Sequence, residues 1–78
     1  MEGYIGQVIL FAGNFAPKGW HFCDGQLMRI QSHEVLFSIL GCMYGGDGQS
    51  SFGLPKIDPP TPNLQYIICI DGTYPCRN

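Results

Sequence analysis

The dipeptide Asp24-Gly25 constrains this chain more than any other feature, because it lies between two short apolar runs. Asp-Gly is a strong signal for a two-residue type I′ hairpin turn, since Gly readily adopts the positive φ that this turn requires. The turn predicts that residues 20–23 pair with residues 26–29. Because side chains alternate across a strand, Trp20, Phe22 and Leu27 are expected to share one face and to form the middle of the core.

A single short helix is predicted over residues 32–40, with Ser32 as its N-cap and Gly41 at its end. Its apolar residues recur at helical spacing, and a helix of this length must pack on the hairpin face to be stable. The apolar stripe is expected to consist of Val35, Leu36, Ile39 and Leu40. The core candidates are therefore Trp20, Phe22, Leu27, Leu36, Ile39 and Leu40.

The rest of the chain is predicted to consist of two strands and their connections. Residues 4–11 and 64–70 are rich in β-branched and aromatic residues, and both faces of the first strand are apolar, which favours a strand covered on both sides. A glycine-rich loop (41–55) and a stiff proline-rich connector (56–63) lie between the helix and the second strand. We expect one α+β, mostly β domain over residues 1–78, ending in an extended tail (73–78).

Composition limits what so short a chain can do. A chain of 78 residues buries only roughly 60–65% of its unfolded surface, so its own core is marginal. Lys and Arg total 4 against 6 Asp and Glu, and without a basic patch, nucleic acid and anionic membranes are poor partners. No apolar run is long enough for a membrane span or a recognisable signal peptide. Only 13% of the residues are charged, which predicts that another chain covers part of the surface.

Four cysteines are the disulfide candidates: Cys23, Cys42, Cys69 and Cys76. Their spacing contains no C-x-x-C knuckle, so no zinc site is predicted. Several pairings are open, and Cys23 and Cys69 also fit buried free thiols because they lie in apolar runs. Cys76 lies near the end of the chain, where a bond to Cys42 of a neighbouring subunit is the cross-link we expect in an oxidising compartment.

No catalytic, cofactor-binding or metal-binding residue is predicted, and we expect that the protein is not an enzyme. The glycine run at residues 45–48 lacks the Gly-Lys-Ser/Thr sequence of a P-loop, and Asp47 alone cannot form a calcium loop. A Cys–His dyad could be drawn from His21 or His33 with Cys23, yet no acid is placed to orient it. Tyr44 and Phe52 are the candidate contacts for a glycan ligand.

Five motifs occur in a fixed order over the first two thirds of the chain: GQVILFAGNFAPKGW, FCDGQL, LFSILG, YGGDG and FGLP. In this order they resemble the phage tail collar domain, which occurs in short tail fibres and in microcystin-dependent proteins. Residues 1–55 carry the resemblance, and residues 65–78 are similar to the closing strand and tail of longer family members. Residues 56–60 stand where those members have a long middle segment, and the chain has no His-x-His motif. A receptor-binding head and a bound metal are therefore not implied.

The resemblance implies a structural subunit that assembles with itself, as a homotrimer or a longer polymer, into an extracellular or phage-tail-like fibre. The alternative is a module that binds a surface glycan or receptor. Either role places the protein outside the cell, at a cell surface or on a virion tail.

Overall fold

The strand β5 (Gln65–Cys69) holds the structure together, because it lies between β1 (Val8–Phe11) and β2 (Trp20–Phe22) in a three-stranded sheet. The computed structural model describes residues 3–75. Both neighbours run antiparallel to β5, with Val8 opposite Ile68 and Trp20 opposite Cys69. The predicted strand over residues 64–70 is confirmed, and its central position explains why three consecutive residues at its end are buried.

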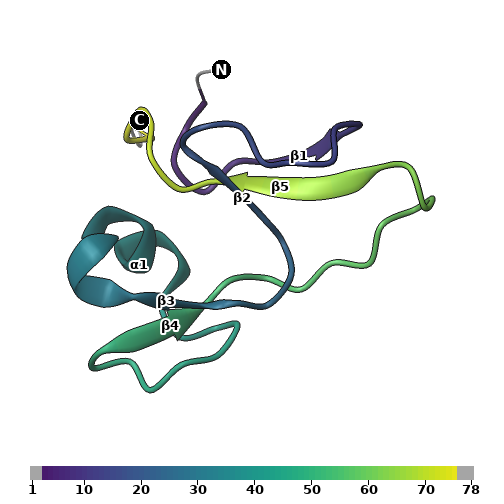
Figure 1. Ribbon diagram of the computed structural model, residues 1–78. Helices are drawn as coiled ribbons and strands as arrows, with labels where there is room; N and C mark the ends of the chain where they lie inside the picture. The colour runs from purple at the N-terminus through teal and green to yellow at the C-terminus, as the bar shows by residue number, and fades with distance from the viewer. Residues whose placement is uncertain (1–2, 76–78) are drawn as a thin grey trace.

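A second, smaller layer lies beside this sheet (Figure 1). It contains β3 (Leu27–Arg29) paired antiparallel with β4 (Ser51–Gly53), the single-turn 3₁₀ helix η1 (Ile30–Ser32), and the helix α1 (Glu34–Leu40). Short strands and one short helix make this the α+β, mostly β fold that the sequence predicts. The prediction of an unbroken glycine-rich loop missed β4, which lies inside it.

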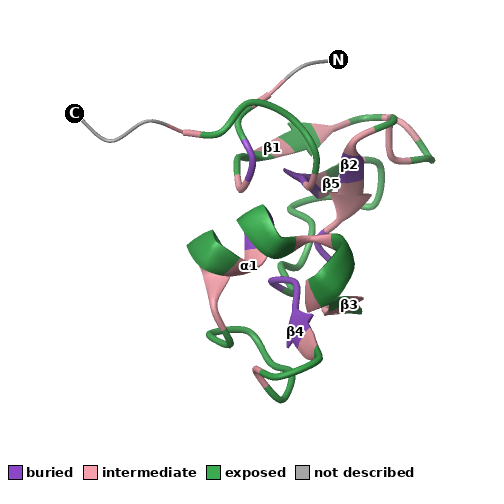
Figure 2. Ribbon diagram, turned by 90° about the vertical axis from the view of Figure 1, so that its left-hand side faces the viewer, coloured by how far each residue is buried: buried purple, intermediate pink, exposed green. Residues whose placement is uncertain are grey.

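The core consists of two clusters on opposite faces of β5. Side chains alternate along a strand, so Ile68 points into one cluster while Ile67 and Cys69 point into the other, and all three are fully buried (Figure 2). Trp20 is buried in the smaller cluster, with Phe22 partly buried beside it. The larger cluster joins the sheet to the second layer; its buried members are Ile5, Cys23, Leu36, Phe52, Leu54 and Ile68.

The predicted hairpin around Asp24-Gly25 is wrong. Gly25 has φ +82, but no residue other than Gly has a positive φ in the described part of the chain, so a type I′ turn is not formed. The Asp24 carboxylate instead accepts a hydrogen bond from the backbone N–H of Gln26 (3.0 Å). The strands before and after this turn separate, because β2 pairs with β5 and β3 pairs with β4.

This separation also changes the predicted core. Leu27 is 58% exposed, since β3 lies in the other sheet and not beside Trp20 and Phe22. Ile39 is also exposed, whereas Leu36 is buried and Leu40 is partly buried against the larger cluster. Leu27 and Ile39 are therefore wrongly predicted as core residues.

The helix begins later than predicted and presents a different face. Ser32 ends η1, and His33 occupies the N-cap of α1 without a side-chain capping bond. Gly41 ends the helix as predicted, with its N–H bonded to the carbonyl of Phe37 (2.7 Å). The buried stripe is shifted toward Phe37, whose ring packs against that of Phe52 with 5.5 Å between centroids.

The strand β1 is an edge strand, not a strand covered on both sides as predicted. Val8 and Leu10 are exposed on one of its faces, because the larger cluster does not extend over these side chains. The tail begins close to the start of the chain, where Thr73 forms an isolated parallel bridge with Tyr4. The predicted course of the tail beyond residue 75, including Cys76, lies outside the described residues.

Candidate functional site

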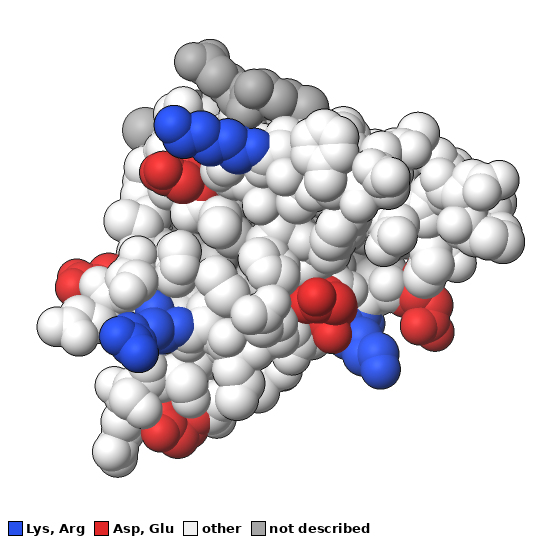
Figure 3. Space-filling model, in the orientation of Figure 1, with Lys and Arg blue, Asp and Glu red and all other residues white. Residues whose placement is uncertain are grey.

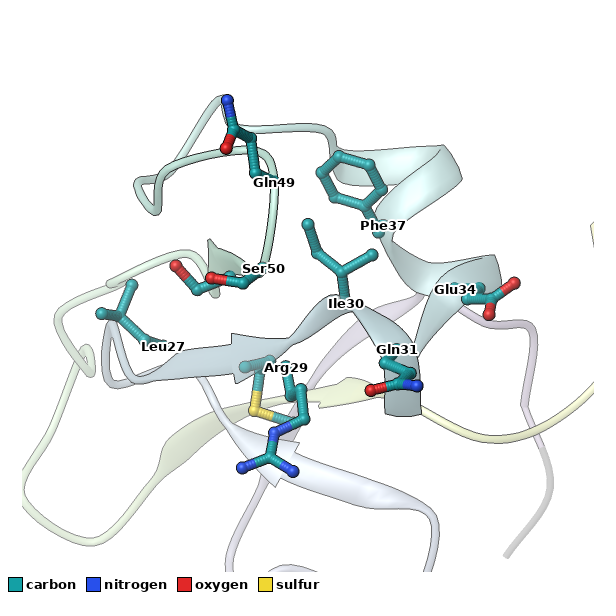
Figure 4. A pocket seen from close by; sticks show the side chains of 10 residues that line it. Leu27, Arg29, Ile30, Gln31, Glu34, Phe37, Gln49 and Ser50 are labelled. Carbon is teal, nitrogen blue, oxygen red and sulfur yellow. The ribbon is translucent and has the colours of Figure 1, made fainter.

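A groove of about 1000 Å³ lies between α1 and the glycine-rich loop, above β3 and η1. Figure 4 shows Phe37 and Gln49 on its two sides with Ile30 between them, while the Arg29 side chain points away. The apolar side chains that line it are Leu27, Met28, Ile30 and Phe37, and the polar ones include Glu34, Gln49 and Ser50. An apolar floor with a few polar groups at its rim is the usual composition of a binding site.

One wall of the groove is held in place by Asp47. Its Oδ1 accepts hydrogen bonds from the backbone N–H groups of Gln49 (2.9 Å), Ser50 (2.8 Å) and Ser51 (3.0 Å). These donors hold the pKa of Asp47 well below its usual range. The loop's N–H groups are thus already occupied by a carboxylate of the same loop, which agrees with a structural loop and not a phosphate site.

The close approach of the loop to β4 requires glycine at position 46. Gly46 has φ +88, and a Cβ added there would lie 2.4 Å from the Cα of Phe52. An L-residue would therefore be strained in its backbone and would also clash with β4. The glycine run serves the packing of the loop onto the strand.

The two candidate ligand contacts do not form a common site. Phe52 is fully buried, because it lies opposite Met28 on the face of the β3–β4 pair that meets the larger cluster. Its prediction as a ligand contact is wrong. Tyr44 is 45% exposed, but it does not line the groove.

The described cysteines are free thiols: Cys23 and Cys69 are buried, and Cys42 is exposed. Burial raises the pKa of Cys23 to about 11, with a further contribution from the Asp24 carboxylate, and burial also raises the pKa of Cys69. Both thiols are therefore protonated at neutral pH and are poor nucleophiles. Cys76 lies outside the described residues, so a bond between it and Cys42 stays a prediction.

The histidines have local contacts and do not form a catalytic arrangement with Cys23. His21 Nδ1 lies 3.0 Å from the carbonyl oxygen of Phe22 and 4.0 Å from a carboxylate oxygen of Asp24. The carbonyl of His33 accepts the N–H of Phe37 in the first turn of α1. Within residues 3–75, no group of three His, Cys, Asp or Glu side chains could hold a metal ion. Within the same range, no helix has the length and apolarity needed to cross a membrane.

The groove is the part of the site that sequence analysis missed. Ile30, Phe37 and Gln49 come from three separate segments. The pairing of β3 with β4 brings Ile30 and Gln49 together, and the contact between the Phe37 and Phe52 rings adds the helix. The one signal available was Phe37, an aromatic residue beside the predicted helical stripe.

The fold and the groove define a small β-rich domain whose polar side chains mainly shape loops. The model of one protein family, the Phage Tail Collar Domain, matches residues 6–62. The chain therefore belongs to the phage tail collar domain family. A search of curated proteins finds no match. Membership of this structural family indicates a structural role in a phage tail fibre and a location on the virion tail.

Proposed function

We propose that the protein is a structural subunit that assembles with itself, as a homotrimer or a longer polymer, into a fibre. The observation that carries this proposal is the amount of apolar surface left open by a chain with few charges. The exposed large apolar residues are Tyr4, Val8, Leu10, Phe15, Leu27, Val35, Ile39, Met43, Tyr44, Ile57 and Tyr74.

The charged side chains do little to break up this surface. Figure 3 shows few of them on one face of the molecule, some beside an opposite charge, and the right-hand end of this face, over the right-hand ends of β1 and β5 in Figure 1, is uncharged. A typical globular domain has about 25% charged residues in its whole sequence, whereas 13% of this chain is charged. Many exposed apolar side chains with few charges among them are typical of a surface that another chain covers.

Electron microscopy of the purified protein at micromolar concentration tests the proposal. We expect discrete assemblies or fibres much larger than one domain of 8.6 kDa. A field of particles no larger than a monomer would contradict self-assembly.

The proposed cross-link between Cys42 and Cys76 of a neighbouring subunit has its own test. The exposed position of Cys42 supports it, because a thiol must be accessible to bond with another chain. We expect a ladder on a non-reducing gel that collapses with reductant and is absent in Cys42→Ser. A single monomer band from intact, oxidised assemblies would rule the bond out.

The groove supports a second candidate function, the binding of a surface glycan or receptor. Its apolar floor and its amide, hydroxyl and carboxylate groups suit a carbohydrate, which offers both apolar ring faces and hydroxyls. A glycan array with wild type, Gln49→Ala in the groove and Tyr44→Ala outside it tests this function. Specific hits lost only in Gln49→Ala support groove binding, and hits retained in that variant place the ligand elsewhere.

A further inference from the structure

The outer edge of β1 has no partner in the described structure. The backbone N–H of Cys69 donates to the carbonyl of Gln7 (2.9 Å), and alternate residues of an antiparallel strand direct their backbone groups to the same neighbour. Ile9 and Phe11 therefore face β5, while the N–H and C=O groups of Val8 and Leu10 point away from it. No turn or loop hydrogen bond from the described residues reaches these groups.

This edge also lacks the devices that normally protect a strand from pairing. Native proteins place charges, proline or bulges on exposed edges. Residues 3–17 contain no charged residue, and β1 itself contains no proline. Val8 and Leu10 add apolar side chains that are 37% and 45% exposed. The outer edge of β1 is thus unpaired, and exposed apolar side chains flank it.

The other open edges are better protected. The strand β3 has only three residues and carries Arg29, whose charge opposes pairing with a second copy. On β2, also three residues long, the outward-facing N–H of Trp20 already donates to the carbonyl of Pro17 (2.9 Å). The longest strand edge without charge is that of β1.

We propose that β1 pairs antiparallel with β1 of a second copy, about a two-fold axis at Ile9. The proposal rests on the proposed self-assembly and names one surface that carries it. Two three-stranded sheets would become one continuous sheet across the axis. A two-fold contact alone closes into a dimer, so a trimer or a longer polymer needs a second contact between subunits.

The outward-facing residues determine the register. With Val8 opposite Leu10 of the second copy, both outward-facing residues of each strand meet outward-facing partners and can exchange backbone hydrogen bonds. Ile9 then lies opposite Ile9 of the second copy. A shift by one residue places outward-facing groups against inward-facing ones, and a shift by two leaves one pair without partners.

The same register explains why the occupant is a second copy. Val8 and Leu10 come to lie beside Leu10 and Val8 of that copy on one face, so the exposed apolar side chains cover each other. No like charges meet at the axis, because the segment has none. A strand edge whose groups complement themselves under a two-fold rotation needs no other partner.

Disulfide trapping tests the register directly, in a Cys42→Ser, Cys76→Ser background that removes the two cysteines of the proposed cross-link. Ile9→Cys would place two Cα atoms about 4.5 Å apart, as in non-hydrogen-bonded pairs, which a disulfide can span. Gln7→Cys is the matched control on the same strand, since its two copies would lie roughly 13 Å apart along the strands. We expect dimer from Ile9→Cys under mild oxidation and monomer from Gln7→Cys. Equal trapping, or more in Gln7→Cys, would overturn the proposed pairing.

Size-exclusion chromatography of charge variants separates this inference from self-assembly as such. Leu10→Lys places a charge at the proposed edge, and Met43→Lys places one at a side chain that is 75% exposed on the other layer. We expect Leu10→Lys to weaken association at least tenfold and Met43→Lys to elute with wild type. If Leu10→Lys assembles like wild type, or both variants lose association equally, the edge pairing is wrong while self-assembly stands. A monomeric wild type would overturn both.

Discussion

A substitution of Phe52 tests whether this residue packs in the core or contacts a ligand. Its place in a glycine-rich loop suggested exposure, but its side chain is fully buried. Burying a Phe side chain contributes roughly 1.5–3 kcal/mol, and an aromatic pair such as Phe37–Phe52 adds about 0.5–1.5 kcal/mol. With the cavity that remains, Phe52→Ala should lower the free energy of unfolding by about 3–5 kcal/mol. A domain of this size has only about 4–12 kcal/mol in total, so the variant should be close to unfolding.

Urea denaturation followed by the fluorescence of Trp20 measures this loss, at one protein concentration because association shifts apparent stability. Phe52→Leu retains most of the buried area and should cost less than about 1.5 kcal/mol. Tyr44→Ala, from the same loop but partly exposed, should cost less still. Ordinary substitutions change the free energy of unfolding by roughly 1 kcal/mol. If Phe52→Ala lowers it by no more than that, the placement of Phe52 in the core is refuted.

Three further predictions concern other parts of the structure. Trp20→Ala removes the only Trp of the chain, so its urea denaturation is followed by circular dichroism, alongside wild type. The substitution should cost about 3–5 kcal/mol, and an unchanged unfolding midpoint would show that Trp20 does not support the smaller cluster. In native protein at pH 8, alkylation followed by peptide mapping should label Cys42 well before Cys23, whose thiol is buried and has a pKa near 11; equal rates would contradict this burial. Because the folded pKa of Asp47 lies below its ordinary value of 3.8, the loop contacts should persist as the pH falls from 7 to 4 and fail only at more acidic pH. Amide resonances of Ser50 should report this, and they should be shifted throughout that range in Asp47→Ala.

The strand β5 could be predicted from sequence because its signal is local and strong. Residues 66–70 are all apolar, and four of the five are β-branched or aromatic; a strand buried on both faces needs such a run. The end of the helix was predictable for a similar reason, since Gly41 adopts φ +59 there and only Gly does so readily.

The prediction of a hairpin was wrong because a turn signal carries no information about which other strands are available for pairing. The Asp24 carboxylate does bond to the N–H of Gln26, but residues distant in sequence decide what flanks this segment: Cys23 donates its N–H to the carbonyl of Tyr66, and the carbonyl of Gln26 accepts the N–H of Leu54. These long-range bonds place β2 and β3 in different sheets. The exposure of Leu27 follows from that change alone.

The groove and β4 could not be predicted for a related reason. Ser51-Phe52-Gly53 has little intrinsic preference for a strand, and it becomes one by pairing with β3 and with the carbonyl of Gly45. The wall of the groove then depends on the Asp47 carboxylate, whose hydrogen bonds are made within a loop that composition alone marks as irregular. Contacts between segments distant in sequence therefore determine both the groove and β4.

The mass of the wild-type protein in solution tests most directly whether this collar domain is a self-assembling structural subunit. Sedimentation velocity over a dilution series should show species several times heavier than 8.6 kDa at micromolar concentration, with a distribution that shifts toward lighter species on dilution. A single 8.6 kDa species at every concentration would contradict self-assembly.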